Sequence, residues 1–237
     1  MKLLENSKLE AISSALSVDT PVCEITTRLE SYSCKMAGDH KKLYKQLTNE
    51  PGTTPHDLQI LGPSQTMLLS TSPAYVYSIS SSGDEDSPLN KTIPRKTLIY
   101  LISTLNASFE PDYDFSSCTS HEFSRETNID LVKNAVDSRL LSGMGDRYSP
   151  LSSHLWSVID EEINIKECEM YSYCPDGASD PFSEYGIVWS FNFFFYNRKL
   201  RRILFLTCRA ESKNANEQRD GDGNMDYNYL AFEGVMD

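Results

Sequence analysis

Apolar residues recur every three or four positions in four segments of the chain, which is the spacing of an amphipathic helix. The first segment lies near the N-terminus and has its apolar residues at Leu4, Leu9, Ile12, Ala15 and Leu16. The second begins near Leu98 and ends shortly before Pro111, and the third begins after Asn128. The fourth begins at Ser149-Pro150, where Ser as the N-cap and Pro as the first helical residue favour a helix start.

Stretches rich in β-branched and aromatic residues predict four strands. They cover residues 22–33, 168–174, 187–196 and 200–208, and Asn197-Arg198-Lys199 is the expected turn between the last two. In the third strand Trp189, Phe191, Phe193 and Phe195 share one face, which helices must cover. We therefore expect an α/β protein of the α+β type, with a central, mainly antiparallel sheet of about four strands flanked by helices.

The same pattern divides the chain into four stretches that belong to a single domain. Residues 1–47 hold the first helix, the first strand and a short helix expected after Asp39, and they are too few to enclose a core alone. They must therefore pack against residues 95–210, which hold the remaining elements. Residues 48–94, rich in Pro, Ser, Thr and Gly, are expected to form a long disordered insert, and residues 211–237 a disordered acidic tail.

The chain is acidic, because 34 Asp and Glu residues oppose 22 Lys and Arg residues, for a net charge of −12. Proteins that bind nucleic acid or anionic membranes normally present a basic face, so neither role is expected. No apolar run reaches the roughly 18–20 residues of a membrane span, and the first residues lack the apolar core of a signal peptide. We expect a soluble, intracellular monomer.

The cysteines and histidines do not form a zinc-binding pattern. The six cysteines include no CxxC pair, and the four histidines show neither HxxxH nor HxH spacing, whereas zinc sites are built from such close pairs. Reduced, mostly buried cysteines are expected in an intracellular protein. We expect neither a metal nor another cofactor.

A compact group of polar residues follows the second helix and consists of Asp112, Asp114, His121, Glu122 and Arg125. Two carboxylates and a histidine suit a divalent metal or acid–base catalysis, so a metal-dependent hydrolase that uses Asp112, Asp114 and His121 is one interpretation. The segment has no phosphate loop or activated nucleophile beside it, however. We favour a non-catalytic connection whose polar groups bond to the backbone or dock a partner.

Arg198, Lys199, Arg201 and Arg202 form the one dense basic cluster of the sequence. Such a cluster can be a nuclear-import signal or a patch that binds an acidic partner. It is equally compatible with a hairpin whose exposed side carries solvated cations.

Two Ser-Pro dipeptides mark the insert as a candidate for regulation. Ser72-Pro73 and Ser87-Pro88 are suited to proline-directed kinases, and each phosphate adds about −1.5 to −2 charges. We therefore expect phosphorylation at Ser72 and Ser87.

The chain contains three sequence motifs that occur in the same order in a known protein family. The first is Leu-Glu-Ser-Tyr-Ser-Cys-Lys-Met-Ala-Gly at 29–38, preceded by the opening Met-Lys-Leu-Leu-Glu-Asn. The second joins Pro-Asp-Tyr-Asp-Phe-Ser at 111–116 to Ser-His-Glu-Phe-Ser-Arg-Glu at 120–126, and the third is the aromatic and basic stretch 189–202. Over about 1–47 and 95–210 the chain resembles the Maf family of global repressors of RNA polymerase III transcription.

The resemblance implies a non-enzymatic repressor that binds the RNA polymerase III core at its clamp and cleft. It implies that the repressor hinders recruitment by initiation factor IIIB and its TATA-binding protein. It also implies phosphorylation of the insert by TOR-pathway kinases, and a nuclear protein with a phosphorylated cytoplasmic pool. The residues expected to bind the partner are Tyr32, Lys35, Asp112, Asp114, His121, Glu122, Arg125, Arg198, Lys199, Arg201 and Arg202.

Overall fold

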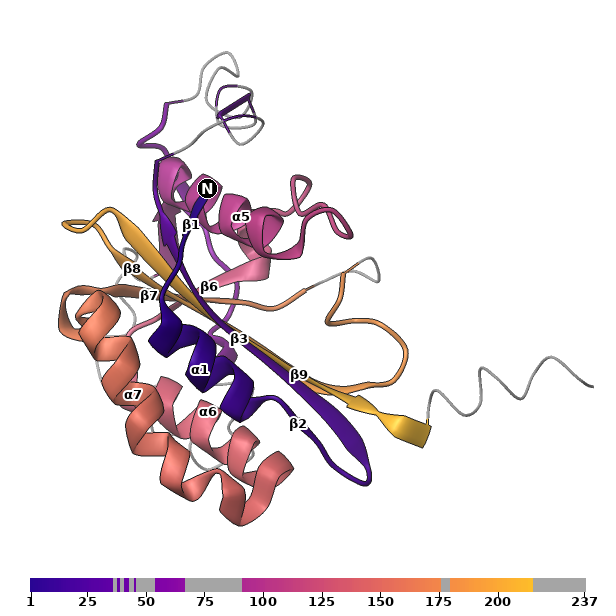
Figure 1. Ribbon diagram of the computed structural model, residues 1–237. Coiled ribbons are helices and arrows are strands. Elements are labelled where there is room, and N and C mark those ends of the chain that lie inside the picture. The colour runs from indigo at the N-terminus through magenta and orange to yellow at the C-terminus, as the bar shows by residue number, and fades with distance from the viewer. Residues whose placement is uncertain are drawn as a thin grey trace, which may run out of the picture.

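The computed structural model of the chain describes residues 1–35, 38, 41–42, 45, 54–66, 91–175 and 180–214. Its centre is a seven-stranded antiparallel sheet in the order β1-β3-β9-β8-β7-β6, with the short β2 beside β3 (Figure 1). These strands are β1 (Lys2–Leu4), β2 (Val18–Asp19), β3 (Cys23–Ser33), β6 (Phe123–Glu126), β7 (Glu169–Tyr173), β8 (Ile187–Asn197) and β9 (Arg202–Ser212). A separate hairpin pairs β4 (Leu58–Ile60) with β5 (Thr92–Pro94). The expected α+β fold is confirmed.

The helices that flank the sheet are α1 (Ser7–Leu16), α5 (Arg95–Phe109), α6 (Ile129–Met144) and α7 (Ser149–Ile163). Asn128 caps α6 as expected, because its side chain accepts a hydrogen bond from Asp130 N. α5 ends two residues before Pro111, since proline is excluded from a helix interior. The prediction of Ser149 as an N-cap is wrong by one position, because Tyr148 is the N-cap and Ser149 the first helical residue.

Three expectations about the strands need correction. Leu4 belongs to β1, which pairs with the end of β3, and not to the first helix. β9 starts two residues later than expected because the turn extends to Arg201, which has φ of 51°. The sheet has seven strands instead of about four, since β1, β2 and β6 are too short for their alternation to be recognised.

The two faces of the sheet are covered to different extents (Figure 1). On one face, the aromatic row of β8 joins α1, α6 and α7 in a single apolar cluster, as the alternating pattern predicted. On the opposite face, α5 packs over Phe194 and Phe205. Beside the C-terminal end of α5 this second face carries polar side chains, which are Thr26, Arg28, Thr207 and Arg209.

Part of the expected insert is folded. Glu126, 4% exposed at the end of β6, accepts hydrogen bonds from Ser64 Oγ (2.6 Å), Gln65 N (2.9 Å), Thr66 Oγ1 (2.7 Å) and Ser172 Oγ (2.7 Å). Because these donors surround one carboxylate, residues 61–66 are held against the sheet edge. The expectation of a disordered segment over 48–94 is therefore wrong for residues 54–66 and 91–94, which include β4 and β5.

Some of the sequence-based predictions concern residues outside the described part of the chain. These are Asp39 itself, the phosphorylation sites Ser72 and Ser87, and the tail from residue 215 onward. Of the short helix expected after Asp39, only Lys41, Lys42 and Lys45 are described, and these three residues are helical. Residues 211 and 212, assigned to the tail by the sequence pattern, belong to β9 instead. Among the described residues, no helix combines the length and apolarity needed to cross a bilayer.

Candidate docking surfaces

The end of β3 and the β8–β9 turn meet at one end of the sheet and bring together basic residues expected to bind a partner. Cys34 N donates to Arg201 O (2.9 Å), so Lys35 lies next to the turn. Lys96 of α5 lies over the ring of Tyr100 (5.8 Å), which packs against β8. We call this surface the basic end; its residues, all exposed, are Lys35, Lys96, Arg198, Lys199 and Arg201.

Two cations of the basic end are neutralised within the molecule. Arg198 Nε lies 3.0 Å from a carboxylate oxygen of Glu169, and Lys199 Nζ lies 2.9 Å from one of Glu167. Exposed pairs of this kind stabilise a fold by at most about 1 kcal/mol. Within the described part of the chain, Lys35 and Arg201 make no ion pair, so their charges are available to an acidic partner.

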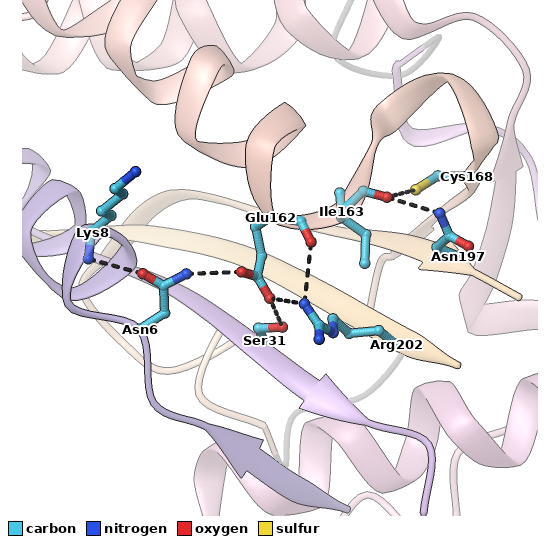
Figure 2. Close-up of polar contacts among 8 residues, drawn as sticks. All are labelled: Asn6, Lys8, Ser31, Glu162, Ile163, Cys168, Asn197 and Arg202. Atoms are coloured by element: carbon cyan, nitrogen blue, oxygen red, sulfur yellow. Dashed lines mark hydrogen bonds and ion pairs between the residues drawn. The ribbon is translucent and has the colours of Figure 1, made fainter. Parts of the chain in front are cut away.

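The neighbouring Arg202 belongs instead to a half-buried network around Glu162 at the end of α7 (Figure 2). The Glu162 carboxylate, 12% exposed, accepts hydrogen bonds from Arg202 Nη1 (2.7 Å), Ser31 Oγ (2.7 Å) and Asn6 Nδ2 (2.8 Å). Figure 2 shows these donors converging on Glu162 from β9, β3 and the segment before α1. The interpretation of Arg202 as a solvated surface cation is therefore wrong, because its guanidinium connects elements of the fold.

The structure places Tyr32 in the core, which corrects the expectation that its side chain meets a partner. Tyr32 is 1% exposed, and its hydroxyl donates to Glu30 Oε2 (2.8 Å). Burial, reinforced by the Glu30 carboxylate, raises the pKa of Tyr32 well above its ordinary value of 10. Glu30 also accepts a hydrogen bond from Ser108 Oγ (2.5 Å), so this group links β3 to the end of α5.

The polar segment after α5 is an ordered connection. Asp114 accepts hydrogen bonds from Ser116 N (2.9 Å) and Ser116 Oγ (2.5 Å), which hold the pKa of Asp114 below its ordinary value. Glu122 ends the helical turn η2 (Ser120–Glu122) and accepts a hydrogen bond from Thr119 N (2.6 Å). Both carboxylates thus bond to nearby backbone, as the non-catalytic interpretation proposed.

The hydrolase alternative requires Asp112, Asp114 and His121 to converge, and the structure does not bring them together. Asp114 is bonded to Ser116, while His121 is exposed on η2 and Arg125 is half-buried on β6. Among the described residues, no group of three or more His, Cys, Asp or Glu side chains is arranged to hold a metal ion. The alternative therefore lacks the cluster on which it depended.

Asp112 instead lies at a pocket of about 230 Å³ that sequence reasoning did not anticipate. Its floor is the polar part of the sheet, where the register pairs Thr26 with Arg209 and Arg28 with Thr207. Its walls are Ser108, Phe109 and Glu110 of α5 and its end, Asp112, Tyr113, Pro181 and Phe182. The available signal was that Arg28 and Arg209 interrupt two strand patterns at positions that face the same side of the sheet.

Comparisons with known proteins agree with the sequence motifs. The model of the Maf1 regulator family matches residues 25–207. The chain is 34% identical over 213 residues to the repressor of RNA polymerase III transcription maf1 of Schizosaccharomyces pombe, a match that covers 90% of this chain and 84% of that protein. It is 33% identical over 244 residues to the repressor of RNA polymerase III transcription of Dictyostelium discoideum, with 90% and 86% covered.

A solved structure supports the same assignment. A crystal structure of citrus MAF1 superimposes with a TM-score of 0.60 at 31% identity, covering 87% of this chain and 98% of the citrus chain. The match to the family model runs from β3 to β9 and so includes the central strands of the sheet. The chain belongs to the Maf1 family.

Proposed function

We propose that this protein represses RNA polymerase III transcription by binding the polymerase core at its clamp and cleft. Bound there, it hinders recruitment by initiation factor IIIB and the TATA-binding protein. The observation that carries the proposal is the similarity, over 90% of the chain, to two proteins named as repressors of this polymerase. Because the similarity extends over both parts of the domain, it concerns the whole fold and not a single motif.

The charge distribution supports docking to a polymerase. A cleft that holds nucleic acid is basic, so a protein with a net charge of −12 is attracted to it over long range. The basic end offers the opposite charge through Lys35 and Arg201 and suits an acidic patch elsewhere on the same partner. Contact with the nucleic acid itself is not required, and the protein acts as a monomer.

Regulation of this activity is part of the proposal. Phosphorylation of Ser72 and Ser87 by a TOR-pathway kinase adds negative charge, weakens repression and keeps a pool of the protein in the cytoplasm. The hydrogen bond from Leu61 N to Lys91 O (2.9 Å) places the two ends of the segment that contains both serines next to each other.

Co-purification of the tagged full chain with RNA polymerase III tests the proposal. Wild-type protein should retain polymerase subunits, and phosphatase treatment should increase the amount retained. The double variant Lys35→Glu/Arg201→Glu, which reverses both charges, should lower the amount of polymerase retained several-fold. The matched control is Arg147→Glu, an exposed cation on the turn η3 (Gly145–Arg147), which should leave retention unchanged. Absence of polymerase subunits from the wild-type sample would rule the proposal out.

A second variant tests regulation. Replacing residues 67–90 by a short Gly/Ser linker should preserve a single cooperative unfolding transition, because loop-closure entropy changes only slowly with loop length. Polymerase retention should also persist, while its dependence on phosphatase disappears. If phosphatase still changes retention, the regulatory sites lie outside this segment.

A further inference from the structure

Arg28 is a half-buried cation that has no carboxylate within ion-pair distance among the described residues. Its Nη1 donates to Ser108 O (2.5 Å), and its guanidinium lies 4.9 Å from the centroid of the Phe109 ring. Glu30, the acid two positions along the same strand, accepts hydrogen bonds from the hydroxyls of Tyr32 and Ser108. A charge withdrawn from water normally has a counter-ion, so the surroundings of Arg28 are incomplete.

Arg209 lines the same pocket and is only loosely paired. Its Nη1 donates to Pro181 O (3.3 Å) and lies 3.8 Å from Glu184 Oε2, while the other oxygen of Glu184 accepts the hydroxyl of Tyr113. The β3–β9 register makes Arg28 and Arg209 diagonal neighbours on one face of the sheet, and the backbone positions of such neighbours are typically about 7–8 Å apart. Both guanidinium groups line the same pocket, where like charges repel each other and an anion between them relieves that repulsion.

The size of the pocket and its acidic lining residues restrict what this anion can be. A volume of about 230 Å³ is smaller than the roughly 300–1,000 Å³ of sites for drug-sized ligands, and it suits one or two side chains. Glu110 and Asp112, which also line the pocket, repel a doubly charged phosphate more strongly than a singly charged carboxylate. The same two acids favour a ligand that carries a basic group beside the carboxylate.

We propose that this pocket is a docking site for a protein partner, which inserts an aspartate or glutamate side chain between Arg28 and Arg209. Each guanidinium has five N–H donors, and the carbonyl bonds to Ser108 and Pro181 involve Nη1 alone, so donors remain for the carboxylate. The bond to Ser108 and the packing on Phe109 orient Arg28 before binding, which limits the entropy lost. Asp112 contacts a basic residue of the same partner segment.

An NMR titration of the full chain with N-acetyl-glutamate N-methylamide tests this inference through the arginine Nε–Hε signals. The signals of Arg28 and Arg209 should shift with a Kd on the order of 10 mM, as expected for so small a ligand. Arg147, exposed on η3, should not respond. The glutamine analogue has the same shape without the charge and should bind at least about fivefold more weakly. Inorganic phosphate should also bind more weakly than the glutamate compound.

Variants separate binding from folding. Arg209→Met should abolish the shift of Arg28, whereas Arg28→Lys, which keeps the charge, should retain measurable binding; the amide spectrum confirms that each variant is folded. The inference is overturned by equal shifts with the two analogues, by a response of Arg147 as large as that of Arg28, or by tighter binding of phosphate. The titration contains no polymerase, so its result is independent of the proposed function.

Discussion

The two faces of the sheet differ in how completely the helices cover them. The face toward α1, α6 and α7 is packed with apolar side chains such as Phe193. The face toward α5 is apolar at one end, where Phe194 stacks on Phe205 (ring centroids 4.6 Å), and polar at the other, where Arg28 and Arg209 line a pocket. One fully covered face supplies most of the core, so part of the opposite face can carry binding groups.

The largest effect is expected from Phe193→Ala on the covered face. Phe193 is fully buried, so its truncation leaves a cavity and should lower the free energy of unfolding by about 3–5 kcal/mol. The matched change on the polar face is Arg209→Met, which should lower it by less than about 1 kcal/mol. Urea unfolding of both variants measures the difference. Equal losses of unfolding free energy would mean that side chains on the polar face contribute as much to stability as those on the covered face.

Glu126→Ala should have the next largest effect, although it lies at the edge of the sheet. Ser64, Gln65 N, Thr66 and Ser172 would lose a charged acceptor, at a total loss of about 2–4 kcal/mol in unfolding free energy. Cleavage by a protease within residues 61–66 should become faster as well. Glu161→Ala removes an exposed carboxylate paired with Lys8 and serves as the control, with a change of less than about 1 kcal/mol.

Glu162→Ala tests whether the basic cluster is partly structural. Loss of the shared acceptor for Arg202, Ser31 and Asn6 should lower the unfolding free energy by about 1–3 kcal/mol. Glu167→Ala, which frees Lys199 at the surface, should change it by less than about 1 kcal/mol. Denaturant unfolding of the two variants side by side measures the contrast. If both variants lose the same small amount of unfolding free energy, Arg202 is a surface cation without a structural role.

The smallest effect concerns alkaline pH. Burial raises the pKa of Cys34, Cys118 and Tyr196, all on the α5 side, to about 12. These groups keep their protons up to a higher pH in the folded protein than in the unfolded chain. Their contribution to stability is therefore fully present below the ordinary values of 9 and 10, and it is lost as the pH rises from about 9 toward 12.

Tyr196→Phe keeps the ring that packs against Tyr100 and removes the titrating hydroxyl. The fall in the urea midpoint between pH 8 and pH 10.5, values on either side of the onset near 9, should be smaller for this variant than for wild-type protein. An unchanged fall would assign the alkaline sensitivity to other groups, such as Cys208 on the covered face.

Local patterns predicted the long elements well. The apolar spacing of α5 and α6 and the alternation in β8 arise from residues close together in the chain. β8 ends one residue later than predicted, α6 begins directly after Asn128 as expected, and α5 begins three residues before Leu98. The short elements were not predicted, because they form only by packing or pairing with residues far away in the sequence. A Cβ at Gly62 would lie 2.1 Å from His121 O, so the chain approaches η2 closely only because glycine stands there, a contact that composition could not indicate.

The sequence by itself determined the fold class, the aromatic face of β8 and the family motifs, because each is recognised from patterns between residues that are close together in the chain. Only the tertiary structure decided which charges are available. Arg202 is held by Glu162, forty positions away, whereas Arg201 beside it is exposed and makes no ion pair among the described residues. Arg28 and Arg209 form one pocket only because β3 pairs with β9. Charge pairing depends on distance in space, and in this protein the paired groups lie far apart along the chain.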